Sequence, residues 1–311
     1  MRRVAVTGAT GFLGRRVVQA LGEDGWTVRI LARRDPIEPL WRAFEPEVVP
    51  GGLEDAPALD ALCADADVVI HAAGLVKARS RAAFDAVNVA GARRVAEAAK
   101  TAGTPHVVLV SSLTAREPQL SHYAASKRAG EAAMAEVLEN RLSIVRPCAI
   151  YGPGDRELLP VFQAAALSPV LPVPDEAARV AMIHVADAAR QTAAIAATRP
   201  TGAAHALCDS RPDGYSWREL MSAAAAACGA TPRLARVPKT LIRAIGITND
   251  FTMLLGRTAM LSSAKARELL HRDWSVPEAE RLAGLPPPQF DLTDGFAHTV
   301  AWYRTAAWMK H

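Results

Sequence analysis

The chain has 311 residues, of which 50% are hydrophobic and 22% are charged, so it can bury a core and is not a disordered tail. No apolar stretch approaches the roughly 18 residues that cross a bilayer, and no secretory signal is evident, so we expect a soluble, cytoplasmic protein with no membrane partner. The net charge of +4 comes from scattered basic residues without interleaved aromatic residues, which argues against nucleic-acid binding.

The four cysteines lie far apart in the sequence and form no C-x-x-C pair. Their spacing argues against a zinc site and against a secreted disulfide framework, so we expect reduced thiols and no bound metal. These residues are Cys63, Cys148, Cys208 and Cys228.

Short apolar runs alternate with helical patterns through the first half of the chain. This regular alternation predicts a doubly wound α/β domain, in which helices cover both faces of a parallel sheet. The predicted strands are residues 4–7, 28–31, 48–49, 68–71, 107–111 and 143–146. The predicted helices are residues 12–21, 56–62, 82–101 and 121–140.

The regular alternation of predicted strands and helices ends after residue 150. The stretch from there to residue 174 is rich in glycine and proline. We expect a smaller, mostly helical lobe that binds substrate, so the predicted domains are residues 1–150 and 151–311. Residues 180–208 are expected to return to the first domain's sheet, and residues 292–308 to form the last helix.

A glycine-rich turn follows the first predicted strand and leads into the first predicted helix. Gly8, Gly11 and Gly14 stand there in a G-x-x-G-x-x-G pattern. Glycines allow the backbone to approach a pyrophosphate closely, and the positive end of the helix stabilises its charge. The pattern predicts a dinucleotide site; the alternative is a glycine-rich turn that binds nothing.

Arg33 and Arg34 follow the second predicted strand, where an NAD enzyme would place an acidic residue against the ribose 2′-hydroxyl. Guanidinium groups suit a 2′-phosphate, so the pair predicts NADP rather than NAD. Arg15 points the same way, because a cation near a helix N-terminus is unfavourable unless an anion lies close. The alternative is a solvated surface pair.

Ser111 and Ser112 end a predicted strand, and Tyr123 and Lys127 follow in the next predicted helix. A separation of four residues puts Tyr123 and Lys127 on one helical face, where the ammonium favours the phenolate and brings a group of pKa about 10 nearer to working pH. The pair predicts acid–base chemistry at Tyr123; the alternative is a packing tyrosine beside a solvated lysine.

Together these motifs resemble the extended short-chain dehydrogenase/reductase superfamily, in the NAD-dependent epimerase/dehydratase family and its dihydroflavonol reductase-like and 3β-hydroxysteroid dehydrogenase-like branch. The resemblance covers nearly the whole chain and implies a Rossmann fold. Further matching segments are His71-Ala72-Ala73-Gly74, Asn88-Val89-Ala90-Gly91, Arg146-Pro147, Tyr151-Gly152-Pro153-Gly154-Asp155 and His184-Val185-Ala186-Asp187.

The resemblance implies that Tyr123 donates or accepts the proton, that Lys127 holds the nicotinamide ribose, and that Ser112 hydrogen-bonds the reacting oxygen. Asn88 would support Lys127 through water, or it is a structural kink or a polar plug. The implied cofactor contacts are Gly8, Thr10, Gly11, Phe12, Leu13, Arg33, Arg34, Leu53, Ala72, Ala73, Gly74, Asn88, Tyr123, Lys127 and Pro147.

The sequence departs from the family pattern near the expected adenine site, where Gly52 precedes Leu53 in place of the usual aspartate. That contact is expected to come from the backbone, or from Glu54 or Asp55.

A short loop before the catalytic tyrosine leaves Thr114 as an alternative to Ser112. Ala149 replaces the asparagine with which sugar-nucleotide enzymes of the superfamily hold their substrate, and this argues against a nucleotide sugar. His71 and His184 are expected to be packing histidines.

The leading hypothesis is an NADP(H)-dependent oxidoreductase that transfers a hydride to or from a carbonyl or secondary alcohol of a small, largely apolar substrate. The alternatives are a nucleotide-sugar epimerase or dehydratase and a non-catalytic NADP-binding subunit; a homodimer is a possible assembly. Candidate pocket-lining residues, each of which could instead be core, are Leu75, Val76, Leu113, Tyr151, Leu158, Leu159, Phe162, Leu167 and Met182.

Overall fold

The computed structural model describes residues 2–78, 80–254 and 262–309, and the chain divides into two compact units. Unit 1 consists of Met1–Pro147, Val185–Leu207 and Glu280–Pro286. Unit 2 consists of Cys148–His184, Cys208–Ala279 and Pro287–His311. The chain therefore passes between the units several times, the first time directly after Pro147.

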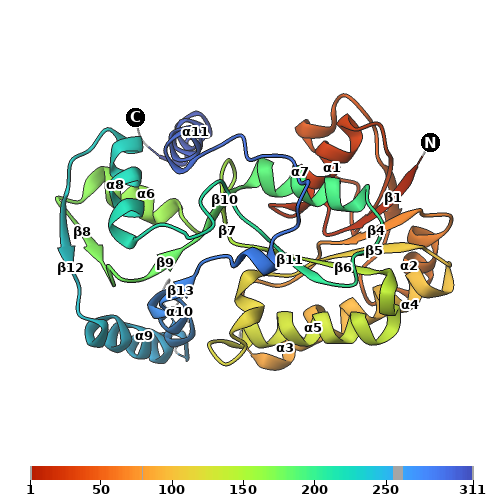
Figure 1. The fold of residues 1–311 in the computed structure, drawn as a ribbon, viewed down its shortest axis with the longest axis horizontal. Helices are drawn as coiled ribbons and strands as arrows, with labels where there is room; N and C mark the ends of the chain where they lie inside the picture. The colour runs from red at the N-terminus through yellow and green to blue at the C-terminus, as the bar shows by residue number, and fades with distance from the viewer. Residues whose placement is uncertain (1, 79, 255–261, 310–311) are drawn as a thin grey trace. The chain divides into compact units, whose positions relative to one another are not determined.

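Unit 1 is built on a seven-stranded sheet in which every pair of neighbours is parallel, and this confirms the predicted doubly wound fold (Figure 1). The strand order is β11-β6-β5-β4-β1-β2-β3, so the order reverses between β1 and β4. Open α/β sheets bind ligands at such a reversal, beyond the carboxyl ends of the strands. The strands are β1 (Arg3–Thr7), β2 (Thr27–Ala32), β3 (Glu47–Pro50), β4 (Val68–His71), β5 (His106–Val110), β6 (Leu142–Pro147) and β11 (Ala204–Leu207).

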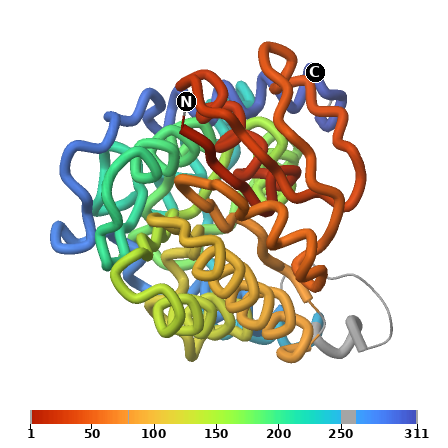
Figure 2. Tube along the Cα trace, turned by 90° about the vertical axis from the view of Figure 1, so that its right-hand side faces the viewer, coloured from red at the N-terminus to blue at the C-terminus, as the bar shows by residue number. Residues whose placement is uncertain are grey.

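Helices cover both faces of this sheet because its strands are apolar on both sides. On one face, α2 (Ala56–Cys63), α4 (Ala92–Thr101) and α5 (His122–Leu138) form a core with strand residues such as Val69 and Val107. The other face is covered by α1 (Gly14–Glu23) and α7 (Val185–Ala196), as Figure 1 shows. Figure 2 shows the orange helix α4 beside the yellow-green helix α5. Short turns complete the unit: η1 (Pro39–Trp41), η3 (Leu113–Arg116) and η4 (Glu139–Arg141).

The helix predicted over residues 82–101 is wrong in one respect, since it is not continuous. It consists of α3 (Arg81–Asp85), a π-helical segment η2 (Ala86–Gly91) and α4. The wider turn brings the carbonyl of Asn88 against α5, where a Cβ added to Gly130 would lie 2.3 Å from that oxygen. π-helical turns often occur at functional sites, and this one carries Asn88.

Unit 2 contains three two-stranded parallel sheets and five α-helices among its described residues. The strand pairs are β7 (Ala149–Tyr151) with β10 (Met182–His184), β8 (Val170–Val173) with β12 (Arg233–Arg236), and β9 (Arg179–Val180) with β13 (Asp273–Trp274). The helices are α6 (Leu159–Leu167), α8 (Trp217–Cys228), α9 (Lys239–Leu254), α10 (Ser263–Leu270) and α11 (Leu292–Thr305), and η5 (Glu278–Glu280) lies where the chain passes into unit 1.

Of the segment expected to return to the large sheet, β11 does so as the edge strand beside β6. Residues 179–184 instead form β9 and β10, which pair within unit 2. Among the described residues, no helix combines the length and the apolar character needed to cross a membrane.

Candidate active site

The glycine turn between β1 and α1 is closely packed against the loop that follows β4. Gly8 has a positive φ of 71°, and a Cβ at this position would lie 2.4 Å from the amide nitrogen of Ala73. A Cβ on Gly14 would lie 2.0 Å from the carbonyl oxygen of Gly8. The N-cap residue Leu13 offers no side-chain cap to α1, although the amides of Arg15 and Arg16 donate to the carbonyls of Gly11 and Leu13. These features fit the expected pyrophosphate contact.

The two loops are tied together at Thr7 and His71, the last residues of β1 and β4. The hydroxyl of Thr7 lies 2.7 Å from Nδ1 of His71 and accepts a longer hydrogen bond from the Ala73 amide, at 3.4 Å. Burial, with a smaller effect from the charge of Lys127, lowers the pKa of His71 to about 3. The imidazole is therefore neutral at working pH, in keeping with its expected packing role.

A cavity of about 340 Å³ lies at the end of β2 and brings together two of the expected cofactor residues, Arg33 and Leu53. Arg34 is exposed but does not line this cavity. Glu54 lines it, whereas Asp55 caps α2 by accepting a hydrogen bond from the amide of Ala58 (3.2 Å). The complete lining is Arg33, Leu53, Glu54, Ala86, Val87, Ala90 and Arg94.

Arg94, which the sequence did not predict as a site residue, supplies a second guanidinium to the cavity wall. It comes from α4, whereas Arg33 follows β2, so only the packing of this helix beside that strand end brings them to one cavity. No local sequence signal distinguishes Arg94 from its neighbour Arg93, which instead pairs with Glu136.

The first turns of α5 carry the predicted catalytic pair. Ser121 begins the helix by accepting a hydrogen bond from the amide of Ala124 (2.9 Å). Lys127 Nζ donates to the carbonyl oxygen of Val110, the last residue of β5 (2.7 Å). Burial lowers the pKa of Lys127 to about 8, although the charge of Glu131 opposes this shift.

Two other elements also lie close to the pair. Tyr123 is half-buried, and its ring centroid lies 6.1 Å from that of Phe84 in α3. A Cβ on Gly74 would lie 3.7 Å from Lys127 Nζ. That distance is an ordinary van der Waals contact, whereas the same Cβ would lie only 3.2 Å from Asn88 Oδ1, so the tight contact at Gly74 is with the asparagine.

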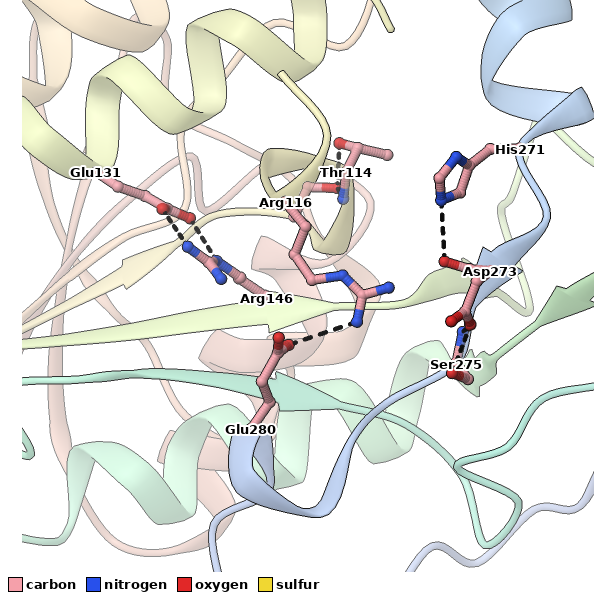
Figure 3. Close-up of polar contacts among 9 residues, drawn as sticks. Thr114, Arg116, Glu131, Arg146, His271, Asp273, Ser275 and Glu280 are labelled. Carbon is pink, nitrogen blue, oxygen red and sulfur yellow. Dashed lines mark hydrogen bonds and ion pairs between the residues drawn. The ribbon is translucent and has the colours of Figure 1, made fainter. Parts of the chain in front are cut away.

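Ser112 and Thr114, the two candidate hydroxyls, are joined to each other. Ser112 Oγ accepts hydrogen bonds from Thr114 Oγ1 (2.9 Å) and from the Thr114 amide (3.2 Å), and Figure 3 shows Thr114 at this contact. Two accepted bonds occupy both lone pairs of the serine oxygen. The Ser112 hydroxyl can then still donate one hydrogen bond to another acceptor.

Asn88 is buried and uses its amide group for contacts within the protein. Its Oδ1 accepts from the amide of Leu75 (2.8 Å), and its Nδ2 donates to the carbonyl of Leu75 (3.0 Å) and to Ser126 Oγ (2.9 Å). These bonds fix the loop after β4 to α5. Of the alternatives considered for Asn88, the contacts favour a polar plug that positions the walls of the site.

A buried ion pair joins α5 to β6 and was not predicted. Arg146 in β6 binds both carboxylate oxygens of Glu131, as Figure 3 shows. Ser111 Oγ donates to the same carboxylate (2.5 Å). A second, looser pair between Arg116 and Glu280, at 3.7 Å, is drawn in the same view. The sequence indicates Arg146 only as part of a motif, because the packing of β6 against α5 determines its partner.

The residues that were candidates for lining a substrate pocket differ in their burial. Tyr151, Phe162 and Met182 are buried in unit 2, where Tyr151 and Phe162 both pack edge-on against Phe296 at 5.0 and 4.9 Å. Leu113 is buried in unit 1. These four are core residues. Leu75, Leu158 and Leu159 are half-buried, whereas Val76 and Leu167 are exposed.

The other expected cofactor residues lie in unit 1 around the glycine turn and the end of β6. Thr10 and Gly11 are exposed at the tip of the turn, and Phe12 is half-buried. Ala72 is half-buried in the loop after β4, and Pro147 is buried at the end of β6.

Comparison with known proteins agrees with this architecture. The model of the NAD-dependent epimerase/dehydratase family matches residues 4–205. A protein of Caulobacter vibrioides named ceramide reductase is 53% identical over 307 residues, which cover 98% of this chain and 96% of that protein.

Two further proteins are similar to the chain. A 4-hydroxy-2-methyl-3-oxo-4-farnesyl-3,4-dihydroquinoline-1-oxide ketoreductase of Stigmatella aurantiaca is 33% identical over 177 residues, covering 51% of this chain and 53% of that protein. The structure of MoeE5 in complex with UDP-glucose and NAD shares the fold. Its alignment covers 99% of this chain and 100% of that chain, with 22% identity and a TM-score of 0.73.

The chain belongs to the NAD-dependent epimerase/dehydratase family and is an NAD(P)-dependent enzyme of the short-chain dehydrogenase/reductase type.

Proposed function

We propose that this enzyme is an NADPH-dependent reductase that converts the ketone of a ceramide-like lipid into a secondary alcohol. The observation that carries the proposal is the placement of Lys127, whose ammonium is anchored on the carbonyl of Val110 one helical turn from Tyr123. The 53% identity to a ceramide reductase along nearly the whole chain supports the substrate class.

The chemistry of the product defines the reacting group. A ceramide is an N-acylated long-chain amino alcohol with a secondary hydroxyl near its amide. Hydride transfer interconverts a secondary alcohol and a ketone, so a reductase that forms a ceramide by this route acts on the ketone at that carbon. The Stigmatella relative is also named for a ketone that bears a long aliphatic group. A largely apolar carbonyl substrate is consistent with both names.

NADPH, when bound, supplies the hydride that reaches the carbonyl carbon. Tyr123 donates its hydroxyl proton to the oxygen as negative charge develops there, and solvent returns a proton to the phenolate. The ammonium of Lys127 favours the phenolate through its charge. Ser112 donates a hydrogen bond to the same oxygen, and Thr114 acts as a positioning residue because it occupies the serine lone pairs.

The preference for NADPH is part of the proposal. Arg33 and Arg94 line one cavity beyond β2, and guanidinium groups bind phosphate oxygens strongly. Glu54 in the same wall would repel a phosphate, so two cations oppose one carboxylate there. The net positive charge supports a 2′-phosphate in this cavity.

The experiment is a reduction assay with the purified enzyme, NADPH and a keto-ceramide analogue whose short acyl chain keeps it soluble. We expect loss of nicotinamide absorbance and a product heavier by two hydrogen atoms in mass spectrometry. The Tyr123→Phe variant is the control for uncatalysed reduction. NADPH binding without turnover on any ketolipid would contradict the proposal and favour a non-catalytic subunit, whereas conversion of UDP-glucose without net cofactor consumption would favour an epimerase.

A further inference from the structure

Helix α9 in unit 2 presents an unusually apolar outer face. Leu241, Ile245 and Ile247 are 51%, 42% and 54% exposed, whereas Ile242 is only 5% exposed. At 100° per residue, the exposed positions Leu241, Ala244, Ile245, Ile247 and Thr248 fall within one arc of roughly 160°. We call these five residues the α9 outer face.

The opposite side of α9 packs against α10, so the outer face is not the side that stabilises the unit. A Cβ on Gly246 would lie 3.1 Å from Cα of Ser263 and 3.2 Å from Cβ of Ala266. Gly246 and Ile242 are both buried on this inner side. A surface helix normally turns its apolar arc inward, and α9 carries apolar residues outward as well.

Basic residues outnumber acidic ones in the sequence around α9. From Leu220 to Asp250 it contains four basic residues and one acidic residue, Asp250 itself. Two of these, Arg236 and Lys239, pair with Glu176 and Asp175. Of the other two, Arg233 lies in β12 beside Val170, away from the outer face, whereas the exposed Arg243 flanks the outer face on the same helix.

We propose that the α9 outer face binds the surface of a bilayer that contains anionic phospholipids, so that the enzyme meets its lipid substrate there. Exposed aliphatic side chains beside a basic residue such as Arg243 are typical of helices that lie in the headgroup region of anionic membranes. The choice of a bilayer over a protein partner rests on the proposed function, because a long-chain ceramide-like ketone resides in a membrane. The docking itself requires neither cofactor nor turnover.

The test is sedimentation of the full-length protein with vesicles of phosphatidylglycerol and phosphatidylethanolamine, without substrate or cofactor. The Leu241→Ser/Ile245→Ser/Ile247→Ser variant should partition onto these vesicles at least tenfold less than the wild-type enzyme. Arg243→Glu should weaken binding several-fold, and its effect should shrink as salt is added. The matched control is Ile37→Ser/Val170→Ser, which removes exposed aliphatic side chains elsewhere and should bind like the wild type.

Unchanged thermal unfolding and unchanged reduction of the soluble short-chain analogue would show that the triple variant is folded. Equal vesicle binding by the triple variant and the wild type would overturn the proposal, as would absence of binding by the wild type. Sedimentation velocity tests whether a second copy of the chain occupies the face instead. If the wild type forms a dimer but does not bind vesicles, and the triple variant is a monomer, the face binds a second copy. Vesicle binding by an enzyme that reduces no ketone would refute the proposed function alone.

Discussion

Glu131 and Arg146 form a buried ion pair, with distances of 2.9 Å from Nε to Oε1 and 2.7 Å from Nη2 to Oε2. Their residues are 4% and 8% exposed, so each charge depends on the other. Removal of one partner from such a pair leaves an uncompensated buried charge. We therefore expect Glu131→Ala to lower the free energy of unfolding by about 3–5 kcal/mol, measured by urea denaturation.

The matched control is Glu136→Ala on the same helix. Glu136 pairs with Arg93, but their side chains are 69% and 39% exposed. Solvent screens the charges of an exposed pair, so the control should remain close to the wild type. Equal losses in the two variants would show that burial does not distinguish these pairs.

Tyr123→Phe tests the proton donor, because it removes only a hydroxyl. We expect turnover of the short-chain ketone to fall about 10²- to 10⁴-fold while NADPH binding stays within about twofold of the wild type. Lys127→Ala should lower both turnover and cofactor affinity. Steady-state kinetics and fluorescence titration measure the two effects, and full activity in Tyr123→Phe would exclude this proton route.

The reduced pKa of Lys127 predicts the alkaline limit of activity. Burial lowers this pKa to about 8, so the free enzyme loses its ammonium as the pH rises through that value. We expect kcat/KM to fall about tenfold per pH unit above it. The free energy of unfolding should rise over the same interval, up to the ordinary lysine pKa, because only the unfolded chain still holds the proton.

Lys127→Arg is the control for this limit, since its guanidinium keeps its charge throughout the range. Its NADPH dissociation constant should stay flat between about pH 7 and about pH 10, whereas that of the wild type should rise above the lysine pKa. Parallel curves for the two proteins would assign the limit to another group.

Arg33 and Arg94 should determine the choice of cofactor. A charge-assisted hydrogen bond to a phosphate contributes about 1.5–3 kcal/mol, so Arg33→Ala and Arg94→Ala should each weaken NADPH binding at least about tenfold. NADH binding should change little, because it lacks the phosphate. Arg34→Ala is the control, since Arg34 does not line the cavity. Equal losses for NADH and NADPH would argue against a phosphate contact.

The glycine turn gives a prediction about stability without cofactor. A Cβ on Gly14 would lie 2.0 Å from the carbonyl oxygen of Gly8, whereas a Cβ on Gly11 would lie 3.1 Å from it. Gly14→Ala should therefore destabilise the protein by about 1–3 kcal/mol, and Gly11→Ala by less than about 1 kcal/mol. Thermal unfolding of the apo variants compares them, and the reverse order would mean that the turn relaxes freely around Gly14.

The large sheet and the features formed by near neighbours in the chain were predictable from the sequence. Alternating apolar runs indicated the strands, and the glycine pattern after β1 indicated a tight turn into a helix. The four-residue spacing of Tyr123 and Lys127 put them one turn apart on α5. Each of these depends on backbone geometry over a few residues, which the local sequence specifies.

Only the tertiary structure decided which distant groups meet. The pairing of Glu131 with Arg146, the shared cavity of Arg33 and Arg94, and the π-helical turn at Asn88 all arise where separate elements pack. The sequence predicts that residues 180–208 return to the large sheet, yet β9 and β10 pair within unit 2. The local sequence around an apolar or charged residue is the same whichever element that residue contacts. Its contact partner is therefore determined by how distant elements pack, which the local sequence does not specify.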